Sequence, residues 1–309
     1  MNNSTLKLAV SPHIHGGRST AGIMRDVLIA LVPAAVAGSV IFGLRACLVL
    51  AICVASSVGF ELLFNLIMKK DLTVGDLSAA VTGLLLGLNL PATAPLWQCV
   101  IGSLFAIVVV KCLFGGIGCN LVNPAIAARV FMLVAFGSLA TPAFPTIVDT
   151  ASGATPLTPE GASVYSLREL FFGLHGGSIG ETCAAALLAG GLYLLVKRVI
   201  TWQLPVAFIA TVFVFSFLVD GMSVTNALAW ILSGGLMIGA FFMATDYTTS
   251  PVTSWGKIIF GIGAGVLTCL IRFWGNYPEG VSFAILFMNI LNPYIDSWTA
   301  RKPFGGEKA

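Results

Sequence analysis

Charged residues are scarce in this chain. Of its 309 residues, 16 are Lys or Arg and 13 are Asp or Glu, so that 9% are charged, while 57% are hydrophobic. A soluble globular domain carries about 25% charged residues, because polar side chains have to cover its surface. The composition therefore excludes a soluble globular fold and indicates a protein whose outer surface faces lipid.

Residue patterns that bind metals or nucleotides are also missing. The seven cysteines stand mostly within apolar runs, where a free thiol packs as a small hydrophobic group. Cys112 and Cys119 are the one pair whose spacing also allows a metal, and packing is the favoured role. The histidines, at 13, 15 and 175, show no metal-ligand spacing, no cysteine cluster suits an iron–sulfur centre, and no G-x-G-x-x-G follows a strand. These absences exclude an iron–sulfur cluster and a dinucleotide site within the chain.

Apolar runs that could cross a membrane recur along the whole chain. A helix needs about 20 apolar residues to span a hydrocarbon core of about 30 Å. We expect such helices at 24–43, 46–67, 76–90, 96–113, 122–139, 183–198, 203–219, 224–243, 256–273 and 280–296. The third is short and ends at Asn89-Leu90-Pro91, which is typical of a broken or re-entrant element buried in protein. The predicted fold is an all-α integral membrane protein with about ten transmembrane helices.

Basic residues are distributed unevenly along these predicted crossings. The first twenty residues lack the apolar core of a cleavable signal peptide, so the N-terminus is expected to stay in the cytoplasm. Ten crossings then place Arg45, Arg168 and Arg272 outside. The twelve basic residues placed inside are Lys7, Arg18, Arg25, Lys69, Lys70, Lys111, Lys197, Arg198, Lys257, Arg301, Lys302 and Lys308. Because cytoplasmic loops carry an excess of Lys and Arg, this predicts a cytoplasmic N-terminal segment (1–23) and a cytoplasmic tail (297–309).

The two halves of the chain resemble each other weakly. TGLLLGLNLPAT at 82–93 matches SGGLMIGAFFMAT at 233–245, and other segments match at similar offsets. An odd number of spans in each copy forces the second copy to enter the membrane upside down. We therefore expect two inverted five-helix repeats, 24–139 and 183–296, with a central site between them.

A polar loop, 140–182, joins the two repeats and is expected to lie outside the cytoplasm. Its length exceeds that of a simple connector, which favours a functional segment or disorder. It contains DTASGAT at 149–155. In general, such a stretch is a turn whose hydroxyl groups satisfy the backbone.

The same stretch resembles the flavinylation sequence D-x-x-[ST]-G-A-[ST]. In that sequence a flavin transferase attaches FMN through its phosphate to the final hydroxyl group, and every fixed position matches here. The resemblance implies a covalent FMN on Thr155, held as a phosphoester. The other matching positions are Asp149, Ser152, Gly153 and Ala154. The two small residues would let the loop enter the transferase, and the aspartate would help to place the acceptor or a metal.

Four further stretches strengthen a resemblance to one family. They are MRDVLIALVPA at 24–34, GCNLVNPAIAARVF at 118–131, FMATDYTTSPVTSWGK at 242–257 and YPEGVSFAILFMNILNP at 277–293. Together with the SGAT loop, their order and spacing resemble the D subunit of the Rnf complex. This family is similar to the B subunit of the sodium-pumping NADH:quinone oxidoreductase (Nqr). The chain lacks the long N-terminal extension of the Nqr protein, which favours the Rnf family.

The resemblance implies a multi-pass protein of the bacterial cytoplasmic (inner) membrane. It would relay electrons inside a complex that couples ferredoxin and NAD⁺ to the movement of Na⁺ or H⁺, without being catalytic alone. The implied partners are the A, B, C, E and G subunits of the Rnf complex, a flavin transferase and membrane lipid, but no nucleic acid. An Nqr-type B subunit is one alternative. A urea-channel-like solute channel without redox function is another, because inverted five-helix repeats also build such channels.

Two groups of polar residues within or beside the spans are candidate cofactor sites. Asn123 and Arg129 lie in the fifth span, where Pro124 interrupts backbone bonding and a buried cation is costly. They predict a polar pocket near a flavin phosphate or ring, although Arg129 could instead pair with a carbonyl group or reach the interface. Thr245 and Asp246 form a polar break after the eighth span. In the family this break resembles part of an ion site or of a second, non-covalent flavin site, for riboflavin for example.

Three acidic residues lie close to the cytoplasmic ends of predicted spans, namely Glu61, Asp246 and Asp296. Carboxylate oxygens are ligands that hard cations prefer, so these residues are candidates for cation entry. The alternative is that each simply lies at the membrane interface.

Overall fold

The computed structural model describes residues 19–140, 143–145, 165–275 and 280–300. Thr155 and the rest of the stretch 149–155 lie outside the described residues. Within the described ranges the regular structure is helical, and the only strand-like pairing is an isolated bridge between Ala143 and Gly177. The prediction of an all-α chain is therefore confirmed for this part of the protein.

Helices occur at each of the ten predicted positions. In the first half they are α1 (Thr20–Phe42), α2 (Leu44–Ile67), η1 (Val74–Asp76), α3 (Ser78–Leu88), α4 (Leu96–Leu104), the π-helix η2 (Phe105–Cys112), α5 (Pro124–Ala135) and η3 (Gly137–Ala140). The short α6 (Leu167–Phe172) precedes the second half, which contains α7 (Ala184–Val196), α8 (Gln203–Val219), α9 (Val224–Leu232), α10 (Leu236–Ile238), the π-helix η4 (Gly239–Met243), α11 (Ser254–Trp274) and α12 (Gly280–Thr299).

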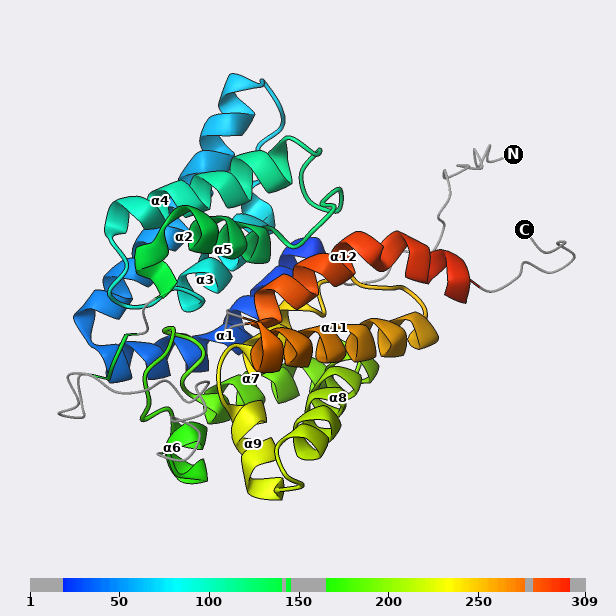
Figure 1. Ribbon diagram of the computed structural model, residues 1–309. Helices are drawn as coiled ribbons and strands as arrows, with labels where there is room; N and C mark the ends of the chain where they lie inside the picture. The colour runs from blue at the N-terminus through cyan, green and yellow to red at the C-terminus, as the bar shows by residue number, and fades with distance from the viewer. Residues whose placement is uncertain (1–18, 141–142, 146–164, 276–279, 301–309) are drawn as a thin grey trace, which may run out of the picture.

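The helices form two groups (Figure 1). Helix α2 packs against α3 and α4 in one group, and α8 packs against α9 and α11 in the other. Helix α1 lies against α7, and α5 lies against α12, so each half contributes one helix to each of these two contacts. The close approach depends on small residues. Gly190 on α7 leaves no room for a Cβ atom beside the Ala30 carbonyl group of α1, and Gly83 on α3 similarly faces Cys53 of α2.

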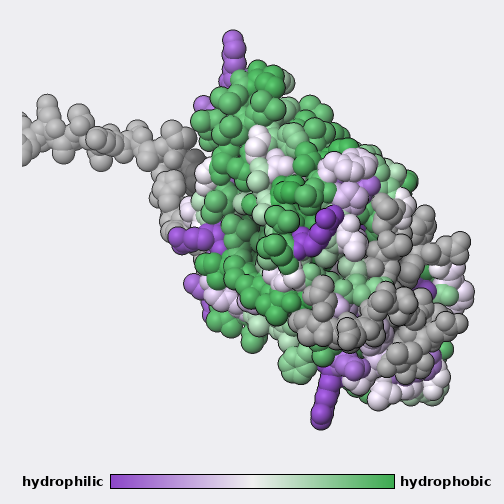
Figure 2. All heavy atoms as spheres, turned by 90° about the vertical axis from the view of Figure 1, so that its left-hand side faces the viewer, coloured by the Kyte–Doolittle hydropathy of each residue, from purple (hydrophilic) through white to green (hydrophobic). Residues whose placement is uncertain are grey.

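Large apolar side chains lie on the outside of the helices. On α1, Val32, Val36 and Val40 are 52%, 55% and 63% exposed, whereas Ala30 and Ala34 on the opposite face are buried. The four-residue spacing places the valines on one helix face. Figure 2 shows a broad hydrophobic surface on one side of the molecule, with hydrophilic residues projecting mainly at its margins. Such a surface would be unfavourable in water and suits contact with lipid tails.

Length separates the helices into two classes. Helices α1, α2 and α11 are long and apolar enough to cross a membrane, and the pair Val224–Leu232 and Leu236–Met243 passes the same test as one span bent by 67°. The other predicted spans coincide with shorter apolar helices of 10–17 residues, except α12, which passes through Pro293. The described residues thus support a membrane protein with at least three full-length spanning helices.

Polar side chains begin several helices by bonding the free N–H groups of the first turn. The Ser19 hydroxyl accepts a hydrogen bond from Gly22 N at 3.1 Å at the start of α1. The Thr253 hydroxyl accepts one from Gly256 N at 3.0 Å at the start of α11. At the start of α6, Ser166 and Glu169 form a capping box. Hydrogen bonds from Ser166 to the Glu169 carboxylate hold the pKa of this group below its ordinary value.

Helix α3 is short and ends inside the protein, as its sequence predicts. The carbonyl groups at and just after its end are bonded by residues 174–183, the last part of the connection between the two halves. Gly180 N donates to Leu88 O at 2.7 Å, and Ile179 N donates to Leu90 O at 3.0 Å. An unpaired carbonyl group is costly in an apolar interior, so these two bonds allow the helix to end there. Most of this segment is buried although it is neither helix nor strand.

The break between α9 and α10 is stabilised by an arginine from α11. Arg272 Nη1 donates to Trp230 O at 2.8 Å, and Nη2 donates to Ser233 O at 3.2 Å. These are carbonyl groups at the C-terminal end of α9, where a positive charge is favourable. Arg272, which was counted among the basic residues on the outer side, is therefore buried at the end of α11 and is not a charge of a solvated loop.

Candidate functional site

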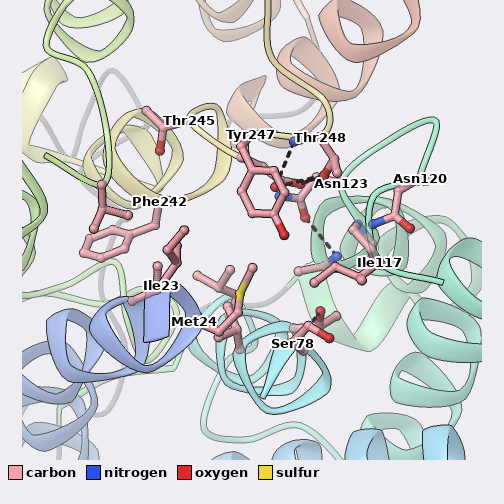
Figure 3. Close-up of a pocket in the computed structure, with 18 of the residues that line it drawn as sticks. Ile23, Met24, Ser78, Ile117, Asn120, Asn123, Phe242, Thr245, Tyr247 and Thr248 are labelled. Carbon is pink, nitrogen blue, oxygen red and sulfur yellow. Dashed lines mark hydrogen bonds between the residues drawn. The ribbon is translucent and has the colours of Figure 1, made fainter. Parts of the chain in front are cut away.

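A pocket lies between the two halves of the protein (Figure 3). It is bordered by the first turns of α1 and α3, the segment before α5, the end of α7 and the residues that follow η4. Its lining residues include Ile23, Met24, Val27, Ser78, Val81, Thr82, Leu85, Lys111, Ile117, Asn120, Asn123, Leu194, Phe241, Phe242, Thr245, Asp246, Tyr247 and Thr248. Three residues predicted from sequence, Asn123, Thr245 and Asp246, thus meet in one pocket.

Asn123 joins the first half of the chain to the second. Its side-chain oxygen caps α5 by accepting hydrogen bonds from Ala125 N at 3.0 Å and Ile126 N at 3.3 Å. Its amide nitrogen donates to Met243 O at the end of η4, at 3.3 Å. Pro124 follows at the first helical position, where its missing N–H group costs nothing. The sequence Asn-Pro therefore both begins α5 and fixes it against the second half.

Asp246 organises the segment after η4. Its carboxylate accepts hydrogen bonds from Thr248 Oγ1 at 3.0 Å and from Thr249 Oγ1 at 3.4 Å. The side chain is half-buried, and burial raises the pKa of this carboxyl group above its ordinary value, while the threonine bonds oppose the shift. Thr245 Oγ1 instead donates to Phe241 O within the preceding turn, at 2.6 Å. The turn holds Thr248 and Tyr247 at the pocket, where Figure 3 shows the Tyr247 ring extending into its centre.

Asn120 presents an unsatisfied acceptor. Its side-chain oxygen is buried and has no hydrogen-bond partner among the described residues, although the residue as a whole is half-buried. A carbonyl oxygen in this position is costly unless a donor reaches it. Asn120 lies across the pocket from Phe242 (Figure 3), so a bound molecule could supply that donor.

Lys111 and Ser78 also reach the pocket and were not predicted as site residues. Lys111 Nζ donates to Ser78 Oγ at 2.6 Å and forms an ion pair with Glu61 Oε1 at 2.7 Å. Lys111 and Glu61 are each 2% exposed. Lys111 was counted among the basic residues on the cytoplasmic side, and the structure adds that its side chain is buried and points to Glu61 of α2. A lysine at the end of an apolar run, with a glutamate in a neighbouring run, was the available signal.

The remaining predicted residues are placed as follows. Arg129 is buried on α5, but it is not among the residues that line the pocket. Asp149, Ser152, Gly153, Ala154 and Thr155 lie outside the described residues. Asp296 accepts a hydrogen bond from Val252 N at 3.0 Å, which makes it a structural contact between α12 and the segment before α11.

Metal ligands do not cluster in the part of the chain that the structure describes. It contains no group of three His, Cys, Asp or Glu residues that could hold a metal ion. Cys112 is buried and Cys119 is exposed, and both thiols are free. The pocket therefore offers amides, hydroxyl groups, one carboxylate and one ammonium group, which suit an organic ligand.

Comparison with known proteins places this architecture in a family. Residues 7–305 match the model of the NQR2, RnfD, RnfE family. The chain is 47% identical, over 100% of its length and 98% of the relative, to the D subunit of the Na(+)-translocating ferredoxin:NAD(+) oxidoreductase complex of Acetobacterium woodii. It is 39% identical, over 96% of each chain, to the D subunit of the proton-translocating ferredoxin:NAD(+) oxidoreductase complex of Clostridium ljungdahlii. It is 34% identical, over 98% of its length and 99% of the relative, to the D subunit of the ion-translocating oxidoreductase complex of Haemophilus ducreyi. The chain therefore belongs to the NQR2, RnfD, RnfE family.

Proposed function

We propose that this chain is the D subunit of an Rnf-type ferredoxin:NAD⁺ oxidoreductase of the bacterial cytoplasmic membrane. In this proposal it relays electrons through a covalent FMN on Thr155 while the complex moves Na⁺ or H⁺. The full-length similarity to relatives that carry this name supports the assignment to the Rnf complex over an Nqr-type B subunit. Because one of these relatives is named for Na⁺ and another for protons, their names leave both ions open for this chain.

The helix contacts support two inverted repeats of five helices. The pairs α2 with α4 and α8 with α11 occupy corresponding places in the two halves, as do α2 with α3 and α8 with α9. The contacts α1 with α7 and α5 with α12 join corresponding helices, as expected beside a twofold axis. In such folds, substrates and cofactors bind between the repeats. The pocket around Asn123 has this location.

Basic residues support cytoplasmic termini, whereas exposed tryptophans mark the ends of spans at both interfaces. Exposed Trp202, Trp255 and Trp298 stand at the ends of α8, α11 and α12 that are expected to face the cytoplasm, while Trp97 and Trp274 stand at ends expected to face outward. Tryptophan is enriched at both membrane interfaces. Since Lys111 and Arg272 are buried, one basic residue is removed from each side of the count, which leaves eleven inside and two outside.

The pocket residues fit a second, non-covalent flavin such as riboflavin. A flavin ring has an apolar benzenoid end and a polar end with hydrogen-bond donors and acceptors. The apolar wall comes from α1, α3 and η4, through Met24, Leu85 and Phe242. The buried Asn120 oxygen would accept a hydrogen bond from the ring, and Asn123 retains a second amide hydrogen for donation. When bound, such a ring would supply one-electron and two-electron redox chemistry, while these residues orient it and exclude water.

Two redox groups would solve a problem of distance. A hydrocarbon core of about 30 Å is too wide for one efficient electron transfer. A flavin on the loop 140–182 would lie outside, whereas the pocket opens among helix ends expected to face the cytoplasm. A second centre in this chain or in a neighbouring subunit is therefore required for a relay.

The experiment for the covalent flavin is mass spectrometry of Thr155. The protein is produced together with a flavin transferase and digested, and one FMN-phosphoryl adduct is expected on the peptide that contains Thr155. The Thr155→Val variant should lose both the adduct and the fluorescence of the denatured polypeptide on a gel. Thr150→Val, in the same loop, is the matched control and should retain both. An unmodified Thr155 beside an active transferase would falsify the proposal of a covalent flavin.

A further inference from the structure

The ion pair between Glu61 and Lys111 links two cavities. Lys111 lines the pocket between the repeats. Glu61, 2.7 Å from it, lines a separate cavity together with Lys70, Asp71 and other residues, which we call the Lys70 cavity. The charged pair therefore stands between the pocket and the Lys70 cavity, with the ammonium group on the pocket side.

The hydrogen bonds around the pair fix this order. Ser78 accepts a hydrogen bond from Lys111 Nζ at 2.6 Å and itself donates to Asp76 through a short bond. Thr73 Oγ1 donates to Glu61 Oε1 at 2.9 Å. Figure 3 shows Ser78 at the edge of the pocket, opposite Thr248. Lys111 is thus held beside the pocket by Ser78 and Glu61.

Stability alone is a weak explanation for this pair. Replacing a buried ion pair by apolar residues is often neutral or stabilising, because both charges lose their hydration. Here the second carboxylate oxygen, Glu61 Oε2, is buried and has no hydrogen-bond partner among the described residues. The arrangement bears a desolvation cost that an apolar contact between α2 and η2 would avoid. Lys111 also lies in a π-helix, a rare conformation that is frequent at functional sites.

Charge in the pocket favours one redox state of a flavin ring. Among the described lining residues, Lys111 is the one cation and Asp246 the one carboxylate. An oxidised ring that gains two electrons and one proton becomes a monoanion. A positive charge near the ring stabilises this reduced anion and has little effect on the neutral oxidised ring.

We propose that Lys111 and Glu61 set the reduction potential of the flavin bound between the repeats. Lys111 stabilises the reduced anion, and Glu61, farther from the ring, limits that effect by neutralising part of the ammonium charge. The inference rests on the proposed second flavin and adds the residues that tune it. Neither residue is required to touch the ring.

The proposal predicts that Lys111→Met and Glu61→Gln shift the reduction potential of the flavin in opposite directions. Lys111→Met removes the positive charge, so binding of reduced riboflavin should weaken about tenfold or more relative to oxidised riboflavin. For a two-electron couple, each tenfold change lowers the potential by about 30 mV. Glu61→Gln leaves the ammonium group without its counter-charge and should raise the potential. A purely structural pair would instead weaken the binding of both redox forms in both variants.

The test uses the full-length chain in detergent, in a Thr155→Val background so that added riboflavin is the only flavin. Affinities for oxidised and reduced riboflavin and the midpoint potential are measured at one pH for each variant. Lys70→Met is the matched control. It removes a lysine of the Lys70 cavity whose ammonium group lies 5.5 Å from the centre of the Phe64 ring. It should leave the reduction potential of the flavin unchanged.

A double variant keeps the test decisive if a single variant fails to fold. Glu61→Gln with Lys111→Met leaves no buried unpaired charge, and the lost ammonium group is nearer to the ring than the lost carboxylate. Its potential should therefore fall, but by less than in Lys111→Met. Unchanged potentials in the double variant, or shifts of the same sign in both single variants, would overturn the inference alone. A parent protein that binds neither form of riboflavin would overturn the flavin pocket and the inference together.

Discussion

The packing of Gly180 against the end of α3 predicts a large difference between two similar glycine substitutions. An added Cβ atom at Gly180 would lie 2.6 Å from Leu88 Cβ and 3.1 Å from Leu88 O, the same oxygen that accepts the Gly180 N–H bond at 2.7 Å. Neither atom can move freely, because the backbone of Leu88 at the end of α3 fixes both Cβ and the carbonyl oxygen. At Gly177, three residues earlier, an added Cβ atom would lie 3.5 Å from Thr182 Cγ2, an ordinary contact.

The expected cost follows from these contacts. Gly180→Ala forces the backbone away from Leu88, which adds about 1–3 kcal/mol of overpacking. It also weakens a buried hydrogen bond, whose loss costs about 1 kcal/mol or more when the acceptor stays buried. We expect a loss of about 2–4 kcal/mol, equivalent to roughly 4–8 °C in melting temperature for a chain of this size. Gly177→Ala should leave the melting temperature unchanged or slightly higher, because alanine reduces the entropy of the unfolded chain.

The assay is thermal unfolding of the purified protein in detergent. Both variants and the parent protein are heated at the same rate, since unfolding of membrane proteins is commonly irreversible and the apparent midpoint then depends on the rate. Equal melting temperatures for Gly180→Ala and Gly177→Ala would refute the argument that the segment 174–183 is bonded tightly to the end of α3.

Three further predictions address pH, the pocket and topology. Burial lowers the pKa of His175, so the folded protein favours the neutral form of this side chain. The resulting stability is present above the ordinary pKa of histidine and is lost as pH falls below it. The melting temperature should therefore fall from pH 7 to pH 5, and it should fall less in His175→Gln. Asn123→Ala removes the cap of α5 and the bond to Met243 O, so we expect a loss of about 1 kcal/mol and less acid-releasable flavin. In a cysteine-free protein in intact cells, an impermeant maleimide should label Glu160→Cys and leave Gly305→Cys unlabelled; the reverse pattern would refute cytoplasmic termini.

The positions of the helices could be predicted because hydropathy determines them directly. Each predicted span overlaps a helix, and the early end of the third was visible as Asn89-Leu90-Pro91. The length of a regular helix was less predictable. The predicted span 224–243 is broken at Ser233-Gly234-Gly235, where Gly234 has a φ of 65° and Arg272 from α11 satisfies the carbonyl groups. No local pattern reports a contact about 40 residues away.

Part of the candidate site could be predicted, because its residues interrupt the hydropathy pattern. Asn123, Thr245 and Asp246 were identified because polar residues interrupt apolar runs, and the structure brings all three to one pocket. Lys111 was only counted among the basic residues on the cytoplasmic side, since hydropathy places it at the end of a run. Its partner Glu61 is 50 residues earlier, and only the packing of η2 against α2 brings them together.

Counting the covalent and the releasable flavin of this chain decides whether it holds one flavin of each kind. The protein is purified gently within its complex, this chain is separated from its partners, and acid precipitation divides its flavin into soluble and protein-bound parts. We expect one flavin per chain in each fraction, with the protein-bound part absent in Thr155→Val and the soluble part reduced in Asn123→Ala. Flavin in neither fraction would contradict both flavin sites, and flavin only in the protein-bound fraction would leave a single-flavin relay without the pocket site.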